Sequence, residues 1–326
     1  MFCVLTSIQL RMNCLNLIST DPFFNLAAEE YLFRNRTEDF LILTINDPSV
    51  IIGKHQVAHR ESDTRFVTEN NIPVIRRISG GGTVYHDHGN VNFCFILNST
   101  GGTQVDFRKY SQPVIEFLGS LRINAVLEGK NDLKVDGLKI SGNAEHIYRE
   151  RVLHHGTLLF DTDLQRLRRS LRKDTSGYVT RAIASNPSHV TNIKERTSGI
   201  RDACEFREIM LGYFLGSEGN IKTDLTNSEE KLIETLAETR YRTWEWNYAY
   251  GPEYALNNSF EIGNCNYTCN ISVQDGIIRE FELEGSGPLA QTGINLSGTR
   301  HMPEDLLRAF HQKKINISGE DIFKFF

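Results

Sequence analysis

The chain has 326 residues, of which 40% are hydrophobic and 24% are charged. This length corresponds to about two domains at roughly 150 residues each, and the composition is that of a globular protein with a sizeable core. The 41 acidic residues outnumber the 36 basic residues, which argues against a general affinity for nucleic acids or anionic membranes. No apolar run approaches the roughly 18 residues that cross a bilayer. Collagens, coiled coils, membrane-spanning proteins and disordered chains are therefore excluded.

The cysteines and the N-terminal segment give information about the cellular location of the protein. Six cysteines are scattered along the chain, and only Cys265 and Cys269 are close together. Their spacing is poor for zinc without a second pair, so we expect reduced cysteines and no metal there. The first 20 residues contain Arg11 and no acid, a faint resemblance to a transit peptide that their weak amphipathic order does not support. We expect a cytoplasmic protein, with a mitochondrial location as the alternative.

The first half of the chain alternates helical and strand patterns. Asp21 and Pro22 suit the N-cap and first residue of an amphipathic helix that ends near Arg34. Short apolar runs predict buried strands at residues 40–45, 49–53, 74–78 and 91–97. Aliphatic residues at helical spacing predict helices at residues 113–123 and 164–171. This mixed order predicts an α/β (or α+β) domain built around one central mixed sheet.

The pattern changes in the last part of the chain. Residues 172–201 are rich in turn residues and weakly periodic, and a loop of that length inside a domain is usually functional. Further on, an Asp-Gly turn predicts a hairpin at residues 267–284, and short helices are expected after Pro303 and at the C-terminus. We therefore predict a large domain of residues 1–242 and a small α+β accessory domain of residues 243–326.

A glycine-rich segment in the first third of the chain predicts an anion-binding loop. It reads R-R-I-S-G-G-G-T-V-Y-H-D from Arg76 to Asp87. Three consecutive glycines allow successive backbone N–H groups to surround an anion, and two adjacent arginines can give bidentate contacts to phosphate or carboxylate. A flexible linker is the alternative, but strand-like residues lie directly on both sides. The segment lacks the lysine of a P-loop and the spacing of a dinucleotide-binding fold.

A second segment, from Lys130 to Gly142, predicts a hairpin with two opposed lysines. Its Asp-Gly pair is a strong signal for a two-residue turn, which places Lys134 opposite Lys139. Opposed like charges are unfavourable, and a bound anion would relieve the repulsion; the alternative is a pair of solvated lysines. Asp132 is a candidate Mg²⁺ ligand, because magnesium bound with a nucleotide needs one or two carboxylates.

A third segment contains two adjacent histidines, His154 and His155, within L-H-H-G-T-L-L-F. Adjacent residues on a strand point to opposite faces, so these two do not chelate one ion together. We expect one histidine to line a pocket and the other to be packed or exposed.

Together these segments resemble the lipoate–protein ligase and lipoyltransferase family, which is part of the biotin/lipoate ligase superfamily. R-R-I-S-G-G-G-T-V-Y-H-D, N-D-L with K-I-S-G, H-H-G-T-L-L-F and T-W-E-W-N occur in the order and spacing of that family. F-N-L-A-A-E-E near residue 25 and I-I-G-K-H-Q at residues 51–56 extend the resemblance over nearly the whole chain. Four ordered motifs make the match specific.

The resemblance implies a catalytic domain of the biotin/lipoate ligase fold, a small accessory domain and a two-step reaction. ATP first activates lipoate to lipoyl-AMP, with Mg²⁺ as the expected metal. A lysine of a lipoyl carrier domain then takes the lipoyl group; the carriers are E2 subunits of 2-oxoacid dehydrogenases and the glycine-cleavage H protein. The implied ATP-binding residues are Arg77, Gly82, Thr83, Val84, Tyr85 and Lys139. The implied lipoate-binding residues are Arg76, Ser79, Lys139 and His155.

Lys139 matches the catalytic lysine of that family, and we expect its amine to bridge the α-phosphate and the lipoyl carbonyl. Both steps develop negative charge around the α-phosphate, so catalysis should depend on positioning and electrostatic stabilisation. We expect an apolar tunnel for the acyl chain beside the sheet, with contributions from the strands near residues 40–53.

Related reactions remain as alternatives. A lipoyltransferase would use preformed lipoyl-nucleotide in place of ATP and lipoate. An octanoyl or lipoyl amidotransferase needs a cysteine nucleophile, whereas Cys94 lies in an apolar pattern that suits a buried inert thiol. A non-catalytic binder would lack the lysine, and Lys139 is present.

The sequence departs from the pattern of the family at two positions. It has Lys134 where relatives carry an apolar residue, and His146 where some bacterial ligases have arginine.

Overall fold

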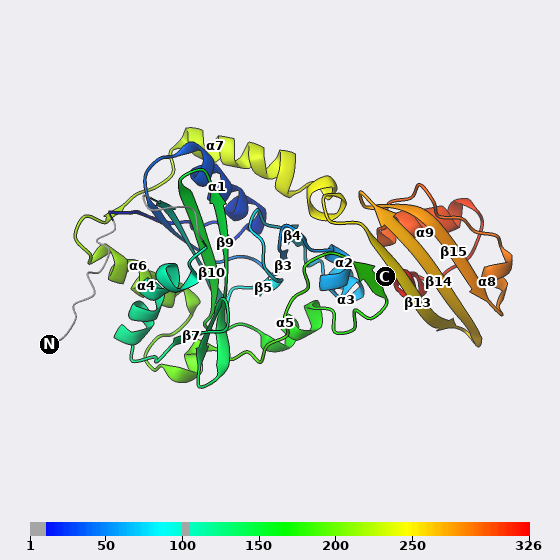
Figure 1. The fold of residues 1–326 in the computed structure, drawn as a ribbon, viewed down its shortest axis with the longest axis horizontal. Coiled ribbons are helices and arrows are strands. Elements are labelled where there is room, and N and C mark those ends of the chain that lie inside the picture. The colour runs from blue at the N-terminus through cyan, green and yellow to red at the C-terminus, as the bar shows by residue number, and fades with distance from the viewer. Residues whose placement is uncertain (1–10, 100–104) are drawn as a thin grey trace.

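The computed structural model describes residues 11–99 and 105–326 of the chain. A large domain with a twisted sheet and covering helices lies beside a smaller one that holds the C-terminal strands and helices (Figure 1). The weak transit-peptide resemblance depends largely on residues 1–10, which lie outside the described residues. Within the described ranges, no helix combines the length and the apolar character that a membrane crossing needs.

A mixed sheet forms the centre of the large domain, and in the described part of the chain it has eight strands. In order across the sheet they are β12 (Ile221–Lys222), β1 (Asn13–Asn16), β2 (Phe40–Thr44), β6 (Asn90–Asn98), β10 (Arg151–Leu159), β9 (Leu138–Tyr148), β8 (Asp132–Val135) and β7 (Val126–Glu128). The pairs of β1 with β12 and β2 are parallel, and the other pairs are antiparallel. The predicted mixed sheet is therefore confirmed.

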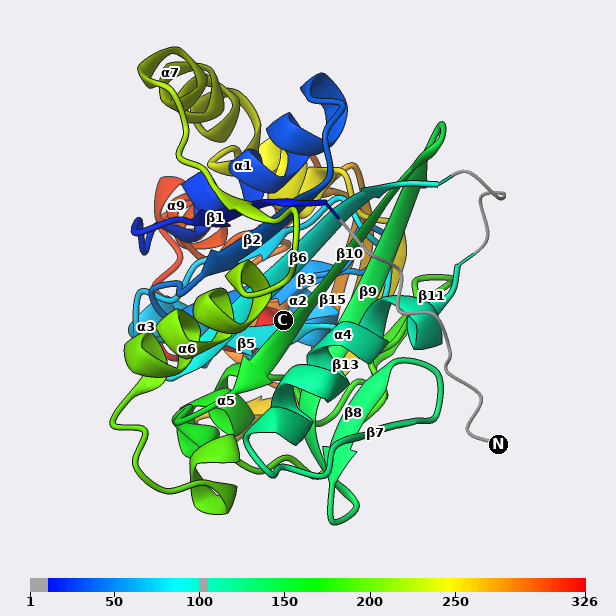
Figure 2. The same ribbon diagram turned by 90° about the vertical axis from the view of Figure 1, so that its left-hand side faces the viewer.

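Both faces of this sheet are covered, which explains why its central strands are almost continuously apolar. Phe93 and Phe95 of β6 face one core, whereas Cys94 and Ile96 face the other. The first core is closed by α4 (Phe107–Ser120) and α6 (Ala203–Leu215), and the second by α1 (Pro22–Asn35) and α7 (Asn227–Leu236). Figure 2 shows α4 and α6 in front of the sheet, with α1 and α7 towards the other face. Asp21 accepts a hydrogen bond from the Phe23 N–H as the N-cap of α1, as predicted.

A second, smaller sheet carries the glycine segment, so the prediction of one central sheet was incomplete. In order its strands are β4 (Val74–Arg76), β3 (Ser49–Ile52) and β5 (Val84–His86). The short helices beside it are α2 (Ala58–Glu61), α3 (Thr64–Glu69) and α5 (Leu164–Ser170). Residues 80–82 connect β4 to β5 and therefore lie at one end of this sheet.

The C-terminal part forms a small antiparallel sheet with helices packed against it, which confirms the predicted α+β character and includes the predicted hairpin. Its strands are β11 (Tyr178–Thr180), β13 (Tyr254–Ile262), β14 (Cys265–Gln274) and β15 (Ile277–Gly285). The helices are α8 (Pro288–Gln291), α9 (Pro303–Gln312) and a 3₁₀ turn at Asp321–Phe325. Asp275 and Gly276 both have positive φ, as the predicted hairpin turn requires. Because β11 precedes residue 243 in the chain, the domain boundary at that position stays a prediction.

Candidate active site

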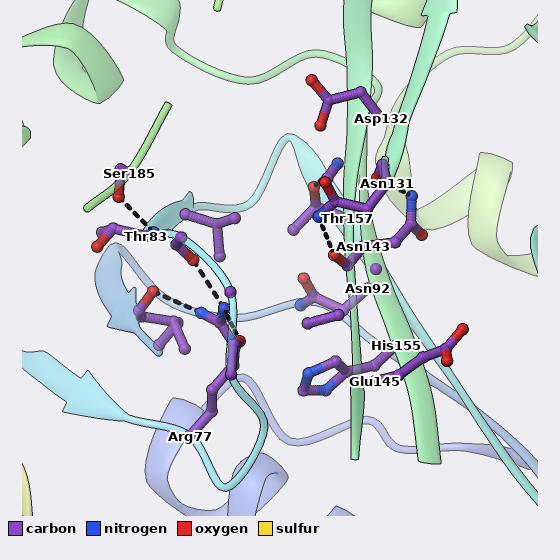
Figure 3. A pocket seen from close by; sticks show the side chains of 18 of the residues that line it. Arg77, Thr83, Asn92, Asn131, Asp132, Asn143, Glu145, His155, Thr157 and Ser185 are labelled. Carbon is purple, nitrogen blue, oxygen red and sulfur yellow. Dashed lines mark hydrogen bonds between the residues drawn. The ribbon is translucent and has the colours of Figure 1, made fainter. Parts of the chain in front are cut away.

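A cavity of about 550 Å³ lies between the glycine segment and the hairpin strands β8 and β9. Thr83 and Arg77 approach it from one side, and Asp132, Asn143 and His155 approach it from the strands opposite (Figure 3). The three sequence segments that were predicted to carry chemistry therefore meet at one cavity.

The shape of the glycine segment depends on the backbone conformation of Gly81 and on a close approach of Gly53 to it. Gly81 has a φ of +86°, a conformation that side chains rarely adopt. A Cβ at the neighbouring Gly53 would lie 2.2 Å from the carbonyl oxygen of Gly81. The carbonyls of Gly80 and Gly82 accept hydrogen bonds from Nη2 of Arg77, at 2.6 and 2.7 Å. The loop therefore has a defined shape and is not a flexible linker.

The buried side chain of Arg77 fixes this loop through hydrogen bonds. Its Nε donates to Ser79 Oγ at 2.9 Å, and its Nη1 donates to the carbonyl of Ile51 at 3.1 Å. Burial lowers the pKa of Arg77 to about 10, so the side chain still carries its charge at neutral pH. Arg77 also lines the cavity, where this charge favours an anion.

Arg76 and Tyr85 are fully buried and do not line the cavity. The Arg76 guanidinium donates to the backbone carbonyls of Gly53, Lys54, Gln56, Trp246 and Asn247. Burial lowers the pKa of Arg76 to about 10 and raises the pKa of Tyr85. Arg76 thus ties β4 to the segment that leads to the accessory domain. A direct contact of Arg76 with lipoate, or of Tyr85 with ATP, stays a prediction that this geometry does not support.

The two lysines of the hairpin face each other as predicted, but neither amine is unpaired. Lys139 Nζ lies 2.8 Å from Asp132 Oδ1, and Lys134 Nζ lies 2.6 Å from Glu128 Oε1. Two carboxylates offset the repulsion between the lysines in this structure. All four side chains line the cavity, so this wall carries two cations within reach of solvent.

The position of Lys139 depends on a glycine beneath its side chain and on the long loop beside its backbone. A Cβ at Gly142 would lie 3.2 Å from both Cε and Nζ of Lys139. The Lys139 N–H donates to the carbonyl of His189 at 2.8 Å, and its carbonyl accepts from the Thr191 N–H at 3.0 Å. Residues 172–201, predicted to be a functional loop, therefore support the strand that carries the lysine.

The same loop reaches the glycine segment through Ser185, which the sequence analysis missed. Ser185 Oγ accepts a hydrogen bond from the Thr83 N–H at 2.8 Å and from Gln56 Nε2 at 3.1 Å. It donates to the carboxylate of Glu61. The I-I-G-K-H-Q motif contained Gln56, but its sequence position gave no indication that it meets a residue more than 120 positions away.

His155 lines the cavity and lies in a chain of hydrogen bonds. Its Nδ1 lies 2.7 Å from Glu29 Oε2, and its Nε2 lies 2.7 Å from Ser79 Oγ. The carboxylate of Glu29 accepts from Nδ1–H, so in the neutral ring Nε2 accepts from the hydroxyl of Ser79, which itself accepts from Arg77. His154 points to the opposite face, as expected, where it is buried and bonded to Glu145 at 2.9 Å. Ser79 lies outside the lining, so its contact with lipoate stays a prediction.

The expected acyl tunnel is only partly apolar. Leu26, Ile51 and Phe93 contribute apolar surface to the cavity. Asn46 also lines it and donates to Nδ1 of His86 at 2.9 Å. Burial lowers the pKa of His86 to about 3, so the ring is neutral and its proton lies on Nε2. The strands near residues 40–53 do contribute, but with polar as well as apolar side chains.

Cys94 is fully buried and does not line the cavity. Burial raises the pKa of its thiol well above the usual value, as expected for an inert cysteine. Among the described residues the cysteines are all free thiols. This environment does not favour a cysteine-based amidotransferase.

Comparison with known proteins identifies the class to which this fold and cavity belong. Residues 21–215 match the family model described as the lipoyl protein ligase A/B catalytic domain. Lipoate–protein ligase 1 of Staphylococcus aureus is 39% identical over 268 residues, which cover 82% of each protein. A crystal structure of lipoate–protein ligase A bound with ATP matches with a TM-score of 0.61 and 27% identity, over 74% of this chain and 98% of that one.

A bipartite lipoate–protein ligase from Thermoplasma acidophilum, described with its E2 lipoyl domain, matches with a TM-score of 0.61 and 26% identity. The match covers 73% of this chain and 96% of that one. The chain therefore belongs to the lipoate–protein ligase family.

Proposed function

We propose that this protein is an ATP-dependent lipoate–protein ligase that forms lipoyl-AMP and transfers the lipoyl group to a carrier lysine. The observation that carries the proposal is the position of Lys139. Its amine lines the same cavity as the glycine loop and His155. A cation beside both an anion-binding loop and an acyl pocket suits a reaction that joins a phosphate to a carboxylate.

In the first step, a carboxylate oxygen of lipoate attacks the α-phosphorus of ATP, and pyrophosphate leaves. Gly82 and Thr83 line the cavity, and Arg77 adds a buried positive charge. We assign the triphosphate to this side. Lys139 then lies where the α-phosphate and the carboxylate meet, and its charge offsets the charge that develops there.

Lipoate binds along the part of the cavity that continues towards His155. Leu26, Ile51 and Phe93 supply apolar contacts for the acyl chain. His155 is held rigidly because both ring nitrogens are hydrogen-bonded. Because the His155 ring is fixed, this side of the cavity can orient lipoate so that its carboxylate lies at Lys139.

Asp132 is our candidate for a Mg²⁺ ligand, and its surroundings fit a hard cation. The carboxylate lines the cavity, and its Oδ1 lies 2.8 Å from the amine of Lys139. Glu128 supplies a second carboxylate on the same wall. Magnesium prefers carboxylate, phosphate and water oxygens, and when bound here it would neutralise phosphate charge.

In the second step, the amine of a carrier lysine attacks the lipoyl carbonyl carbon, an amide forms and AMP leaves. We expect E2 lipoyl domains or the glycine-cleavage H protein as carriers. The basic residues of the run 166–173 are candidates for a rim that meets acidic carrier surfaces. A cytoplasmic location, with the mitochondrion as the alternative, remains our expectation.

The direct test is the mass of an apo E2 lipoyl domain after incubation with the protein, lipoate, ATP and Mg²⁺. We expect the mass of one lipoyl amide, formed only when ATP is present. A parallel reaction with synthetic lipoyl-AMP and no ATP separates the alternatives. Modification in that reaction alone would make the protein a lipoyltransferase, and no modification in either would contradict the proposal.

A further inference from the structure

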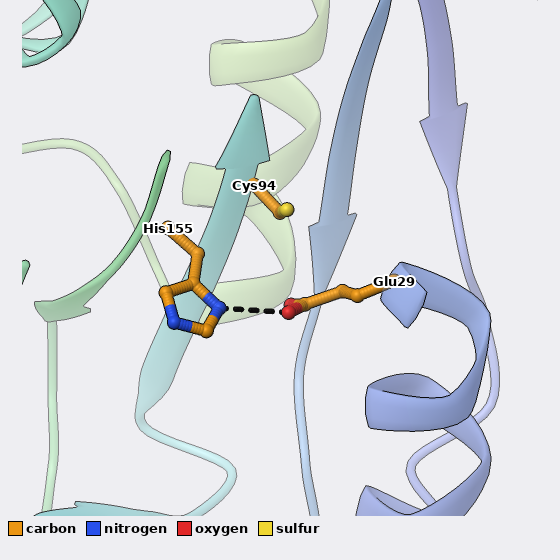
Figure 4. A group of neighbouring side chains, drawn as sticks. All are labelled: Glu29, Cys94 and His155. Carbon is orange, nitrogen blue, oxygen red and sulfur yellow. Dashed lines mark hydrogen bonds and ion pairs between the residues drawn. The ribbon is translucent and has the colours of Figure 1, made fainter. Parts of the chain in front are cut away.

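Three side chains of different donor chemistry converge beside the cavity. Glu29 comes from α1, Cys94 from β6 and His155 from β10 (Figure 4). One ligand atom of each lies within 4.8 Å of the other two, and all three residues are buried. The only hydrogen bond among them that the structure shows joins His155 Nδ1 to Glu29.

This donor set suits a borderline-soft cation. Zinc takes thiolate sulfur at about 2.3 Å and imidazole nitrogen or carboxylate oxygen at about 2.0–2.2 Å, in tetrahedral geometry. Ligand atoms around one zinc are then about 3.3–3.8 Å apart. Glu29 Oε2, which lies 2.7 Å from Nδ1 of His155, would move away from the ring, and Cys94 would approach by up to about 1 Å, since the ligand atoms lie within 4.8 Å of one another. Magnesium is excluded by the same chemistry, because it demands six oxygen ligands. The group therefore differs in kind from the carboxylates of the hairpin wall.

Access and support for such a cation are also present. Glu29 and His155 line the cavity, so an ion can enter from there and keep a fourth, open position towards it. Ser79 Oγ lies 2.7 Å from Nε2 of His155 and can accept a hydrogen bond from it once the ring proton is on Nε2. Hydrogen bonding of the outer ring nitrogen is the usual way in which proteins orient a metal-bound histidine.

We propose that Glu29, Cys94 and His155 form a zinc-binding site whose occupation closes the lipoate end of the cavity. On binding, the thiol of Cys94 loses its proton to solvent and its sulfur bonds the metal. The proton on Nδ1 of His155 leaves, and Nε2 takes up one proton. This proton stays on the ring, where it forms a hydrogen bond to Ser79 Oγ. The carboxylate of Glu29 exchanges its hydrogen bond for the third metal bond, and one proton is released overall.

The binding test uses the untagged full chain and Co²⁺ as an optical probe for Zn²⁺, without substrates. We expect one equivalent of Co²⁺ to give tetrahedral d–d bands and a thiolate-to-cobalt charge-transfer band, and Zn²⁺ to displace it. Cys94→Ser should remove the charge-transfer band and weaken Zn²⁺ binding at least 100-fold. Cys14→Ser is the matched control, because Cys14 is a buried thiol of the same large sheet, and it should change neither.

Two further variants keep the outcome decisive. If Cys94→Ser fails to fold, as circular dichroism would show, Cys94→Ala and Glu29→Gln replace it and should also lose tight binding. Zinc binding that is equal in the wild type and these variants would mean an adventitious ion only, and would overturn the proposal.

The claim that bound zinc closes the lipoate end of the cavity rests on the proposed function. It predicts that zinc inhibits the enzyme, which is measured separately from zinc binding. Zinc should inhibit lipoate-dependent exchange of pyrophosphate into ATP competitively with lipoate, and Cys94→Ser should retain exchange but lose this inhibition at least tenfold. Inhibition that is competitive with ATP, or that persists in Cys94→Ser, would contradict closure of the lipoate end. Absence of exchange in the metal-free wild type would contradict the proposed function and leave the optical result standing.

Discussion

Lys134 and Lys139 face each other across the hairpin of β8 and β9, and each amine is paired with a different carboxylate of the same wall. Opposed like charges would destabilise an ordinary hairpin. The two carboxylates, Glu128 and Asp132, offset this repulsion while leaving both amines at the cavity surface. A polyphosphate that enters the cavity therefore meets two cations that are already held in place.

Replacement of Lys139 by alanine should abolish catalysis while leaving the fold intact. The lysine side chain is about one-fifth exposed and is paired with Asp132, so its removal leaves the core unchanged. Loss of the charge that offsets the developing negative charge typically costs about 10²–10³-fold in rate. Adenylate formation and transfer from supplied lipoyl-AMP should both fall by at least this factor. Near-normal transfer by Lys139→Ala would refute the catalytic assignment.

Replacement of Lys134 by leucine tests whether both lysines serve the nucleotide. We expect the KM for ATP to rise about three- to tenfold, which corresponds to about 0.6–1.4 kcal/mol for a partly solvated charge, with little change in the KM for lipoate. Steady-state kinetics with each substrate varied in turn measures this difference. An unchanged KM for ATP would make Lys134 a solvated bystander.

Gly142→Ala should disturb the position of Lys139 without removing it. The new Cβ would lie 3.2 Å from Cε and Nζ of that lysine, so the amine must move. We expect kcat to fall about tenfold, because small misplacements of a catalytic group are costly, and the unfolding midpoint to change little. Gly119→Ala in α4 is the matched control, since a Cβ there meets nothing within 4 Å. Equal activity of the two variants would count against a strictly positioned lysine.

Acid should destabilise the accessory sheet through His301. This ring is fully buried, donates from Nε2 to the carbonyl of Phe325 and accepts at Nδ1 from the Tyr254 hydroxyl. Burial, assisted by the charge of Arg172, lowers the pKa of His301 from 6.5 to about 4. Between these values the unfolded chain binds more protons, so stability falls as pH falls from 6.5 to 4, by up to about 3 kcal/mol.

Urea unfolding at pH 7 and pH 4.5 measures this loss. His301→Gln should be less stable than the wild type at pH 7 but should lose less on acidification. Exposed His311 supplies the control, and His311→Gln should show the pH response of the wild type. An unchanged response in His301→Gln would assign the acid sensitivity to other groups, such as the neighbouring buried His59.

Local signals in the sequence predicted much of the fold. The N-cap at Asp21, the Asp-Gly turns and the buried strands all appear where they were expected. The separate three-stranded sheet was not foreseen, because an apolar run indicates burial but does not identify the neighbouring strand. The strand β11 was missed for a different reason, because its three residues lie in a turn-rich stretch with little periodicity.

The site was predictable only in part. Lys139, His155 and the glycine loop, to which the motifs pointed, line one cavity, and their roles there stay predictions. Glu29 and Ser185 were missed because their partners lie more than 100 positions away in the chain. A sequence motif does not state whether a side chain enters a cavity or supports it from behind, as Arg76 shows.

The most direct test of the central claim is lipoate-dependent exchange of labelled pyrophosphate into ATP, with Mg²⁺ and without any carrier protein. This exchange requires reversible formation of lipoyl-AMP by the protein itself. We predict exchange that depends on lipoate and is lost in Lys139→Ala. Absence of exchange, with the carrier still modified from supplied lipoyl-AMP, would contradict the ligase assignment and leave a lipoyltransferase.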